Sequence, residues 1–422
     1  MAHLSIGDEL LTGRHPDLDA PHVARWLGER GFALGEVRVL PDDEALIVAA
    51  LEELMARNDL VVTSGGLGPT LDDLSRHAVA RAAGCELEER EEAWEQIAAW
   101  FRVRGIEPSA NNRRQALIPA GARILENRHG TAPGFWLDVE GARHTVSIVA
   151  LPGPPRELTG MLADGALAEF AERFGGPDQR VRQELSLFGL SESVFAERVS
   201  DWMARDVDPT MGVSARDGIL VVALSSSGPG ARERVDEALV AFHDRLGEYV
   251  FAEGDRRLDA VLAEALLASG TKIALAESCT GGRIAAALTR HAGVSAVFGE
   301  GAVTYANEAK HRTLDVPSAV LEAHGAVSPE TAAAMARGIA ERAGADLGLS
   351  VTGIAGPGGG SEDKPVGLVW FGVHWRGRTW VCERRFPPTD RERVRRFAEH
   401  TALHLGLCAL SDRLESVGAV EV

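Results

Sequence analysis

The chain has 422 residues and a formal net charge of −18 at pH 7, with 62 acidic against 44 basic side chains. This length exceeds what one hydrophobic core ordinarily holds, so we expect two or three domains. An acidic chain without a dense Lys/Arg cluster repels a phosphate backbone, which argues against nucleic acid as a partner. No apolar run could span a bilayer and the start lacks a signal-peptide pattern, so we expect a cytoplasmic protein with no membrane partner.

Strand and helix signals alternate over residues 1–168. β-type runs at 3–7, 33–40 and 59–63 are separated by amphipathic helical stretches at 20–31 and 42–55, the second with Asp42 or Asp43 as its N-cap. The βαβαβ order predicts an α/β domain with a mostly parallel sheet and helices on both faces.

A glycine-rich stretch, "SGGLGPTLDD" at 64–73, follows the third predicted strand. In sheets of this kind ligands bind at the carboxyl ends of the strands. Glycines let a ligand approach the backbone, and the paired Asp72 and Asp73 suit Mg²⁺ or another divalent cation. The alternative is that one of these aspartates caps the helix predicted over 74–84.

The next region, residues 175–252, has a different pattern. Strands are predicted at 182–190 and 218–225, and helices at 192–203 and 231–246. This order predicts a small α+β module, which we interpret as a spacer.

Residues 257–416 return to alternating strands and helices, and three polar stretches stand out there. "ESCTGG" (277–282), "TYANEAK" (304–310) and "TGIAGPGGGS" (352–361) each follow a strand-like run. If those strands are parallel neighbours, the three stretches meet at one edge of the sheet. The first stretch also precedes a helix, and its free backbone N–H groups would stabilise an anion or a developing oxyanion.

A hydroxyl nucleophile and an amine stand in these stretches. Ser278 needs a base within hydrogen-bond reach, and a desolvated Lys310 can be that base, whereas arginine cannot. Only three of the 44 basic residues are lysines, which favours a chemical role for Lys310. The alternative is an ordinary surface lysine. Cys279, next to Ser278, should point the opposite way on the strand and be packed.

The C-terminal region resembles the C-terminal domain of the competence/damage-inducible CinA family in "AESCTGG", "TYANEAK", "GAVSPETAAAMA", "VTGIAGPGG" and "KPVGLVWFGV". The resemblance implies an amidohydrolase that converts nicotinamide mononucleotide, a small-molecule nucleotide, to nicotinic acid mononucleotide and ammonia in pyridine nucleotide recycling. It implies no cofactor for this reaction, and a homodimer. The implied catalytic residues are Ser278, Lys310 and Tyr305, and the implied substrate-binding residues are Thr280, Gly281, Gly282, Thr352, Gly353 and Gly356.

The N-terminal region resembles the molybdopterin-binding (MoaB/MogA-like) fold of the same family in "SIGDELLTG", "SGGLGPTLDDLS", "NRRQALIPAGARIL", "GTAPGF" and "LPGPPRE". The resemblance implies a nucleotide site formed by Gly65, Gly66, Gly68, Asp8, Asp72 and Asp73, with the last two as candidate metal ligands. Some members hydrolyse ADP-ribose there with a metal.

Two features complete the resemblance. The segment "RHPDLD" (14–19) departs from the family pattern, because Asp17 and Asp19 stand where asparagine is common. The middle module resembles the family's KH-like linker. Two alternatives to the amidase remain: a metal-dependent ADP-ribose pyrophosphatase in the N-terminal domain, and a non-catalytic pterin- or nucleotide-binding protein.

Overall fold

The computed structural model describes residues 1–141, 144–174, 180–204, 206–388 and 390–422, in two compact units. The first unit comprises Met1–Arg182 with Ser227–Ala231, and the second comprises Gln183–Ser226 with Arg232–Val422. The expected start of the middle module, residue 175, lies outside the described residues.

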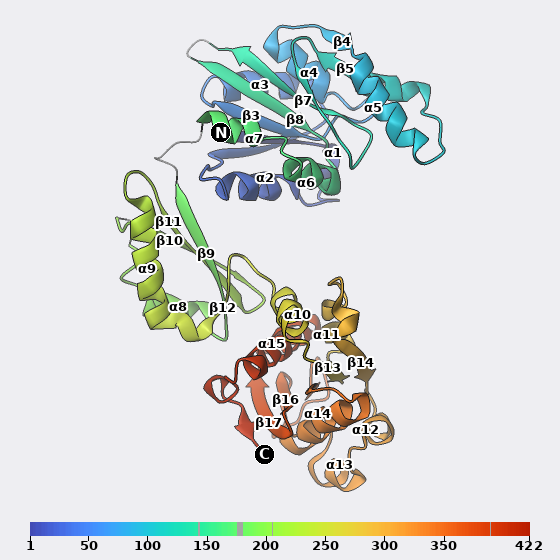
Figure 1. Ribbon diagram of the computed structural model, residues 1–422, viewed down its shortest axis with the longest axis vertical. Coiled ribbons are helices and arrows are strands. Elements are labelled where there is room, and N and C mark those ends of the chain that lie inside the picture. The colour runs from blue at the N-terminus through green and yellow to red at the C-terminus, as the bar shows by residue number, and fades with distance from the viewer. Residues whose placement is uncertain (142–143, 175–179, 205, 389) are drawn as a thin grey trace. The chain divides into compact units, whose positions relative to one another are not determined.

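The first unit is built on a six-stranded sheet of order β2-β1-β3-β8-β7-β6 (Figure 1). Four neighbouring strands are parallel: β2 (Glu36–Leu40), β1 (Ala2–Ile6), β3 (Leu60–Ser64) and β8 (Thr145–Leu151). The other two, β7 (Gly134–Glu140) and β6 (Arg123–Leu125), are antiparallel. The expected mostly parallel α/β sheet is therefore confirmed.

Helices cover both faces of this sheet. One core contains side chains of α3 (Glu44–Met55), α4 (Ser75–Ala83) and α5 (Glu91–Arg102). The other contains side chains of α2 (Asp19–Gly28) and α6 (Pro155–Ala163), with α7 (Ala168–Phe174) following. Shorter elements are α1 (Asp8–Leu11), η1 (Ala110–Ala116) and the paired strands β4 (Leu87–Glu89) and β5 (Leu117–Pro119).

The two predicted helix caps have different outcomes. Asp43 accepts a hydrogen bond from the Leu46 N–H and caps α3. The prediction that Asp72 or Asp73 caps the next helix is wrong: the N-cap of α4 is Leu74, with no side-chain cap. The Asp73 carboxylate accepts instead from the N–H groups of Gly68 and Thr70, because those groups bend back over it at the turn.

The middle module forms a four-stranded sheet of order β10-β11-β9-β12, with a short helix, α8, and a long one, α9. The strands are β9 (Val181–Phe188), β10 (Thr210–Arg216), β11 (Ile219–Ser226) and β12 (Val250–Glu253), and the helices are α8 (Glu192–Arg198) and α9 (Ala231–Leu246). A single turn, η2 (Gly247–Tyr249), precedes β12. Phe188 and Ile219 belong to the core of the C-terminal domain. Apolar side chains of the module are therefore buried against that domain, and the interpretation as a spacer stays a prediction.

The C-terminal sheet has the order β14-β13-β15-β16-β17-β18. Three neighbours are parallel, as the site prediction requires: β14 (Phe298–Val303), β13 (Ile273–Glu277) and β15 (Leu347–Gly353). The remaining strands, β16 (Leu368–Trp375), β17 (Arg378–Arg385) and β18 (Val420–Glu421), are antiparallel. The last strand lies beyond residue 416, the expected end of the domain.

Each face of the C-terminal sheet carries its own helices (Figure 1). One core joins the sheet to α10 (Leu258–Ser269), α11 (Arg283–Leu288) and α15 (Arg391–Leu410), with η3 (Val294–Ala296) beside them. The other joins it to α12 (Asn307–Leu314), α13 (Ser318–His324) and α14 (Pro329–Ala343). A final turn, η4 (Glu415–Val417), leads into β18. Side chains alternate between the cores, so Ala274 and Ala276 face α14 while Ile273 and Leu275 face α10 and α15.

The packing of α14 on β15 leaves no space at Gly348. A Cβ there would lie 2.2 Å from the carbonyl oxygen of Ala336. We expect Gly348→Ala to lower the free energy of unfolding by about 1–3 kcal/mol through overpacking, measured by chemical denaturation. The control is Gly212→Ala on β10, where a Cβ meets nothing within 4 Å. Equal stability of the two variants would contradict this packing.

Candidate active site

The three polar stretches meet at the carboxyl ends of β14, β13 and β15. Glu277 is paired in register with Val303 and Val351. The Ser278 N–H donates to the Val351 carbonyl at 2.9 Å, and the Thr304 N–H donates to the Glu277 carbonyl at 2.8 Å. The strand ends therefore bring Ser278, Thr304 and the 352–361 stretch to one place, as the sequence predicts.

Glu277 closes the turn after β13. Its buried carboxylate accepts hydrogen bonds from the N–H groups of Gly282 (3.0 Å), Ile284 (3.2 Å) and Ala285 (2.9 Å). Glycines at 281 and 282, with φ of +62° and +93°, let the chain reverse around it. The expectation that these N–H groups are free for an anion is wrong, because a buried carboxylate needs several donors of its own.

Lys310 reaches Ser278 from the first turn of α12. Its side chain is buried, with 1% of the residue exposed, and Nζ lies 3.1 Å from Ser278 Oγ. Nζ also donates to the carbonyls of Thr304 (2.8 Å) and Tyr305 (3.5 Å). Burial lowers the pKa of Lys310, opposed only by the Cys279 thiol among the described groups that act on it. The alternative of a surface lysine is therefore wrong.

Nζ donates to three acceptors, Ser278 Oγ and the two backbone carbonyls, which matches the three N–H bonds of an ammonium. Once the amine loses a proton, its two remaining N–H bonds can stay on the carbonyls, and its lone pair can then accept the hydroxyl proton of Ser278. A nucleophile and a base at hydrogen-bond distance are the two parts that serine-based covalent catalysis requires.

Cys279 points away from this pair. It belongs to the core shared by α10, α11 and α15, on the face of the sheet opposite α12 and α14. Burial raises the pKa of its thiol to about 12. The expected alternation of Ser278 and Cys279 is confirmed, and the thiol is held in its protonated, weakly nucleophilic form.

The backbone of Tyr305 contacts the candidate site, but its side chain points elsewhere. Its carbonyl contacts Lys310, whereas its side chain is 62% exposed and its phenol accepts a hydrogen bond from Arg391 at 2.8 Å. Arg391 also donates to the Gly356 carbonyl at 2.6 Å. The phenol is thus joined to the glycine-rich stretch rather than to the Ser278–Lys310 pair.

Arg391 and Arg395, both on α15, are the site residues that the sequence reasoning missed. Arg395 donates to the carbonyls of Cys279 (3.1 Å) and Thr280 (2.8 Å), and so holds the turn that follows Ser278. The signal was the basic run "RERVRR" at 391–396, but charge alone does not show which carbonyls an arginine will reach.

The remaining predicted substrate residues lie around this turn and the glycine-rich stretch. Thr352 is buried and donates from Oγ1 to the Ala326 carbonyl at 2.7 Å. A Cβ on Gly353 or Gly356 would lie 2.7 Å from a side-chain atom of Val369 or Val366, so tight packing requires both glycines. Thr280 differs, because its Oγ1 is buried without a partner in the described structure, which leaves it available to a bound group.

The glycines of the N-terminal loop are needed by the backbone. A Cβ on Gly65 would lie 2.1 Å from the Ile6 carbonyl oxygen, and one on Gly66 would lie 2.3 Å from Ser75 Oγ. Gly68 is packed equally tightly against Asp73. The loop therefore folds onto β1 and α4, whatever ligand it holds.

The acidic residues of this region do not form a metal-ligand set. Asp73 is occupied by N–H groups of its own loop, while the Asp8 carboxylate accepts from the Asp42 N–H at 3.3 Å. Asp72 is hydrogen-bonded with Thr70, which holds the pKa of Asp72 below its usual value. Across the described ranges, no three His, Cys, Asp or Glu side chains are grouped to hold a metal ion. The residues present thus fit a divalent cation poorly.

The segment "RHPDLD" (14–19), which differs from the family pattern, has a structural role. Asp17 accepts from Ser5 Oγ at 2.7 Å and from the N–H groups of Asp19 and Ala20, so it starts α2 and joins the helix to β1. Burial raises the pKa of Asp19 to about 7.

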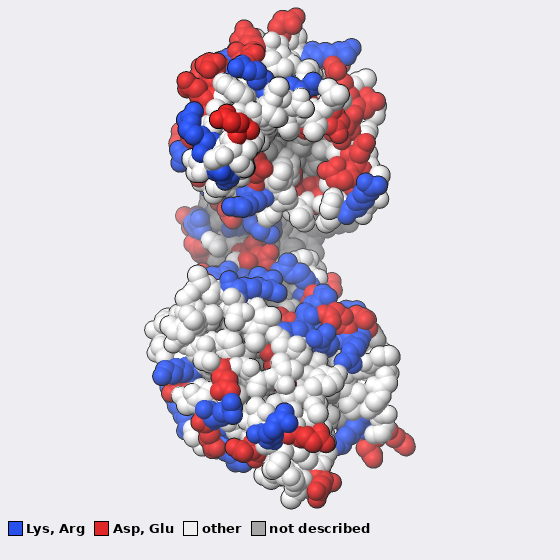
Figure 2. All heavy atoms as spheres, turned by 90° about the vertical axis from the view of Figure 1, so that its right-hand side faces the viewer, with Lys and Arg blue, Asp and Glu red and all other residues white. Residues whose placement is uncertain are grey.

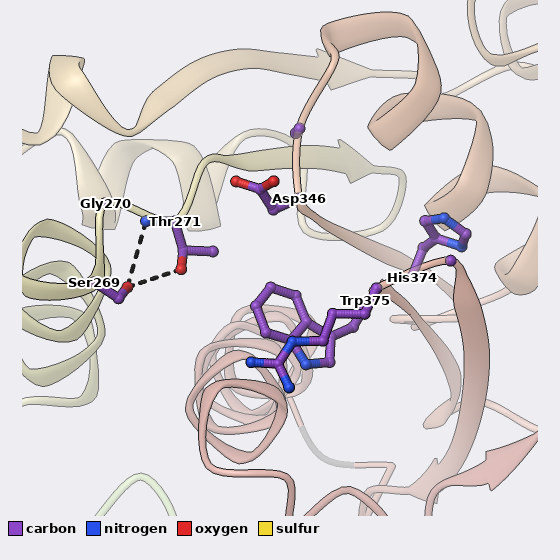
Figure 3. A pocket seen from close by; sticks show the side chains of 9 residues that line it. Ser269, Gly270, Thr271, Asp346, His374 and Trp375 are labelled. Carbon is purple, nitrogen blue, oxygen red and sulfur yellow. Dashed lines mark hydrogen bonds between the residues drawn. The ribbon is translucent and has the colours of Figure 1, made fainter.

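A hollow of about 460 Å³ lies at the other edge of the C-terminal sheet (Figure 3). It is lined by the end of α10, the start of β15 and the β16–β17 turn, including Asp346, His374 and Trp375. Ser278 follows the carboxyl end of β13, whereas this hollow is at the amino end of the parallel strands. It is therefore separate from the candidate site.

On the face drawn in Figure 2, acidic and basic side chains are interspersed, and broad areas of the C-terminal domain carry neither. In the described part of the chain, no helix has the length and apolar character that a membrane crossing needs.

Together, fold and site define a protein of two α/β parts in which the C-terminal sheet sets a serine against a buried lysine. Residues 255–409 match the family described as "CinA C-terminal domain", and residues 2–169 match "Probable molybdopterin binding domain". The chain belongs to the CinA family, which confirms the resemblance seen in its motifs.

Relatives match over nearly the full length. A CinA-like protein of Citrifermentans bemidjiense is 44% identical over 406 residues, covering 96% of this chain and 95% of the relative. One of Geobacter sulfurreducens is 42% identical over 412 residues, covering 96% and 97%. The solved structure of the competence/damage inducible protein CihA from Agrobacterium tumefaciens is 43% identical and covers 37% of this chain and 97% of that chain, with a TM-score of 0.35.

The burial of Cys279 predicts its reactivity. Since a thiolate is the species that is alkylated, we expect iodoacetamide at pH 8 to leave Cys279 unmodified in the folded protein and to label the half-buried Cys85 first. Mass spectrometry of peptides gives the order of labelling. Early modification of Cys279 would show that its thiol is open to solvent, contrary to the packing described.

Proposed function

We propose that this CinA-family protein is an amidohydrolase that converts nicotinamide mononucleotide to nicotinic acid mononucleotide and ammonia. The observation that carries the reaction type is the 3.1 Å contact between Ser278 Oγ and the buried amine of Lys310. The substrate, a small-molecule nucleotide, rests on the family resemblance of the C-terminal motifs.

The proposed reaction proceeds through an acyl-enzyme. Ser278 Oγ attacks the carboxamide carbon while its proton passes to Lys310 Nζ. The lysine then gives that proton to the departing nitrogen, which leaves as ammonia. Water then attacks the acyl-serine while Lys310 again takes a proton. The lysine returns this proton to Ser278 Oγ, so that nicotinic acid mononucleotide is released and the free serine is restored.

The surroundings of Lys310 support its role as a base. The effect of burial on its pKa outweighs that of the neighbouring thiol, which moves the pKa towards the range in which an amine accepts protons near neutral pH. The carbonyls of Thr304 and Tyr305 hold Nζ against Ser278. Arginine at this position could not take the proton, since its guanidinium stays charged.

The proposal is tested with purified protein, nicotinamide mononucleotide and EDTA. We expect ammonia and the acid product in equal amounts, with or without the chelator. A parallel sample with ADP-ribose and Mg²⁺ examines the alternative reaction of the N-terminal domain. Activity lost with EDTA and restored by zinc or magnesium would contradict the Ser/Lys mechanism.

The variant Lys310→Arg distinguishes a lysine that acts as a base from one that only supplies a positive charge. The variant keeps the positive charge but cannot accept a proton, so we expect the rate of ammonia release at saturating substrate to fall by about 10²- to 10⁴-fold. The matched control is Lys272→Arg, at the exposed position just before β13, which should keep full activity. If Lys310→Arg stays within a few-fold of wild type while folded, Lys310 is not the base.

The pH profile follows from the same pKa. The neutral form of Lys310 is the active one, so kcat/KM should rise with pH as the amine loses its proton. Because burial lowers this pKa, the midpoint should lie below the ordinary lysine value of 10.5. A flat profile through this range would be inconsistent with an amine base.

The neighbours Ser278 and Cys279 give a second comparison. We expect Ser278→Ala to abolish ammonia release, because the nucleophile is lost, and Cys279→Ala to keep most of it, because the thiol faces the opposite core. Thermal unfolding of both variants checks that they are folded. The reverse result would identify a cysteine amidase.

A further inference from the structure

α15 touches the candidate site with two arginines near its start. Arg395 holds the carbonyls of Cys279 and Thr280, and Arg391 holds the Gly356 carbonyl and the Tyr305 phenol. Arg283, at the start of α11, forms ion pairs with Glu392 and Glu399 of α15. The position of α15 therefore sets where the turn after Ser278 lies.

The same stretch of α15 is held by the middle module. Asp217, at the tip of the β10–β11 hairpin, forms a 2.8 Å ion pair with Arg396, and its carbonyl accepts from His400 Nδ1 at 3.0 Å. Gly218 is so close to Phe397 that a Cβ would lie 3.3 Å from the ring. Asp217 and Gly218 have φ of +51° and +84°, so the hairpin turns tightly and presents its tip to the helix.

Apolar contacts fix this arrangement. Phe188 of β9 packs on the His404 ring with 4.9 Å between centroids, and Phe188 and Ile219 lie in the same core as Val394 and Ala398 of α15. The hairpin tip is thus the polar end of a continuous contact between the module and α15.

We propose that the β10–β11 hairpin tip is a positioning element for the reaction at Ser278, with Asp217 as its key residue acting through α15. This inference rests on the proposed amidase function. Arg395 and Arg396 are neighbours in one helix, so a rotation or shift of α15 after release of Arg396 also moves Arg395. The turn that Arg395 holds begins directly after Ser278, and a small displacement there lengthens the contact with Lys310.

Displacement of α15 should slow the chemical step rather than weaken substrate binding. Misplacement of reacting groups by about 1 Å can cost on the order of 10²-fold in rate, and loss of one ion pair should displace α15 by less. We therefore expect Asp217→Arg, which sets two cations against each other, to lower kcat by about 10-fold with KM little changed.

The experiment is a charge swap in the full-length protein. Asp217→Arg, Arg396→Asp and the double variant are compared with wild type for kcat, KM and pH profile. The double variant should recover most of the lost kcat, because the ion pair is restored with its charges exchanged. The matched control is Asp201→Arg, whose 2.7 Å partner Arg245 lies within the middle module, and it should keep wild-type kcat.

The outcomes separate the two proposals. A wild-type protein that releases no ammonia from nicotinamide mononucleotide refutes the amidase function and this role with it. An active wild type with equal kcat for Asp217→Arg and Asp201→Arg refutes the positioning role alone, as does a double variant no better than the single ones. If Asp217→Arg fails to fold, Asp217→Asn keeps the turn and removes only the charge. A kcat for that folded variant equal to wild type overturns the inference.

Discussion

The candidate site depends on burying the amine of Lys310 without a carboxylate partner. An isolated buried ammonium is costly, and such a group responds by lowering its pKa. Glu277 is only one residue from Ser278, yet the described charges that act on Lys310 do not include it. The reason is its orientation: its carboxylate is turned to the other face of the sheet and held there by N–H groups of α11.

This division of the two faces organises the surrounding structure. The face covered by α12 and α14 receives Ser278, Lys310 and the Thr352 hydroxyl, which ties β15 to the loop before α14. The opposite face receives Glu277 and Cys279, which are structural. One strand end thus separates a reactive hydroxyl from a carboxylate and a thiol that would compete with it, because adjacent side chains alternate.

The arginines of α15 link the site to the rest of the second unit. A guanidinium can donate to two carbonyls at once, and Arg395 uses this geometry on the turn after Ser278. Other residues of the same helix contact the middle module: Arg396 and His400 bind Asp217, and His404 packs on Phe188. The module therefore contributes to the surroundings of the site through α15.

The sequence by itself determined the alternating elements and the mostly parallel N-terminal sheet, because hydrophobic periodicity and turn residues are local properties. It predicted the meeting of three strand ends in the C-terminal domain only on the condition that those strands are parallel neighbours. It also favoured the Ser278–Lys310 pair, since a lysine in an arginine-rich chain and a serine at a strand end are visible without a fold, but the alternative of a surface lysine was excluded only by the structure. Only the tertiary structure decided what the polar side chains contact. Glu277 accepts the N–H groups expected to be free, Asp73 closes its own loop and caps no helix, and Arg395 and Asp217 meet partners over a hundred residues away. Such pairings depend on which backbone groups the fold leaves without a hydrogen-bond partner, and a local sequence pattern cannot predict which groups those are.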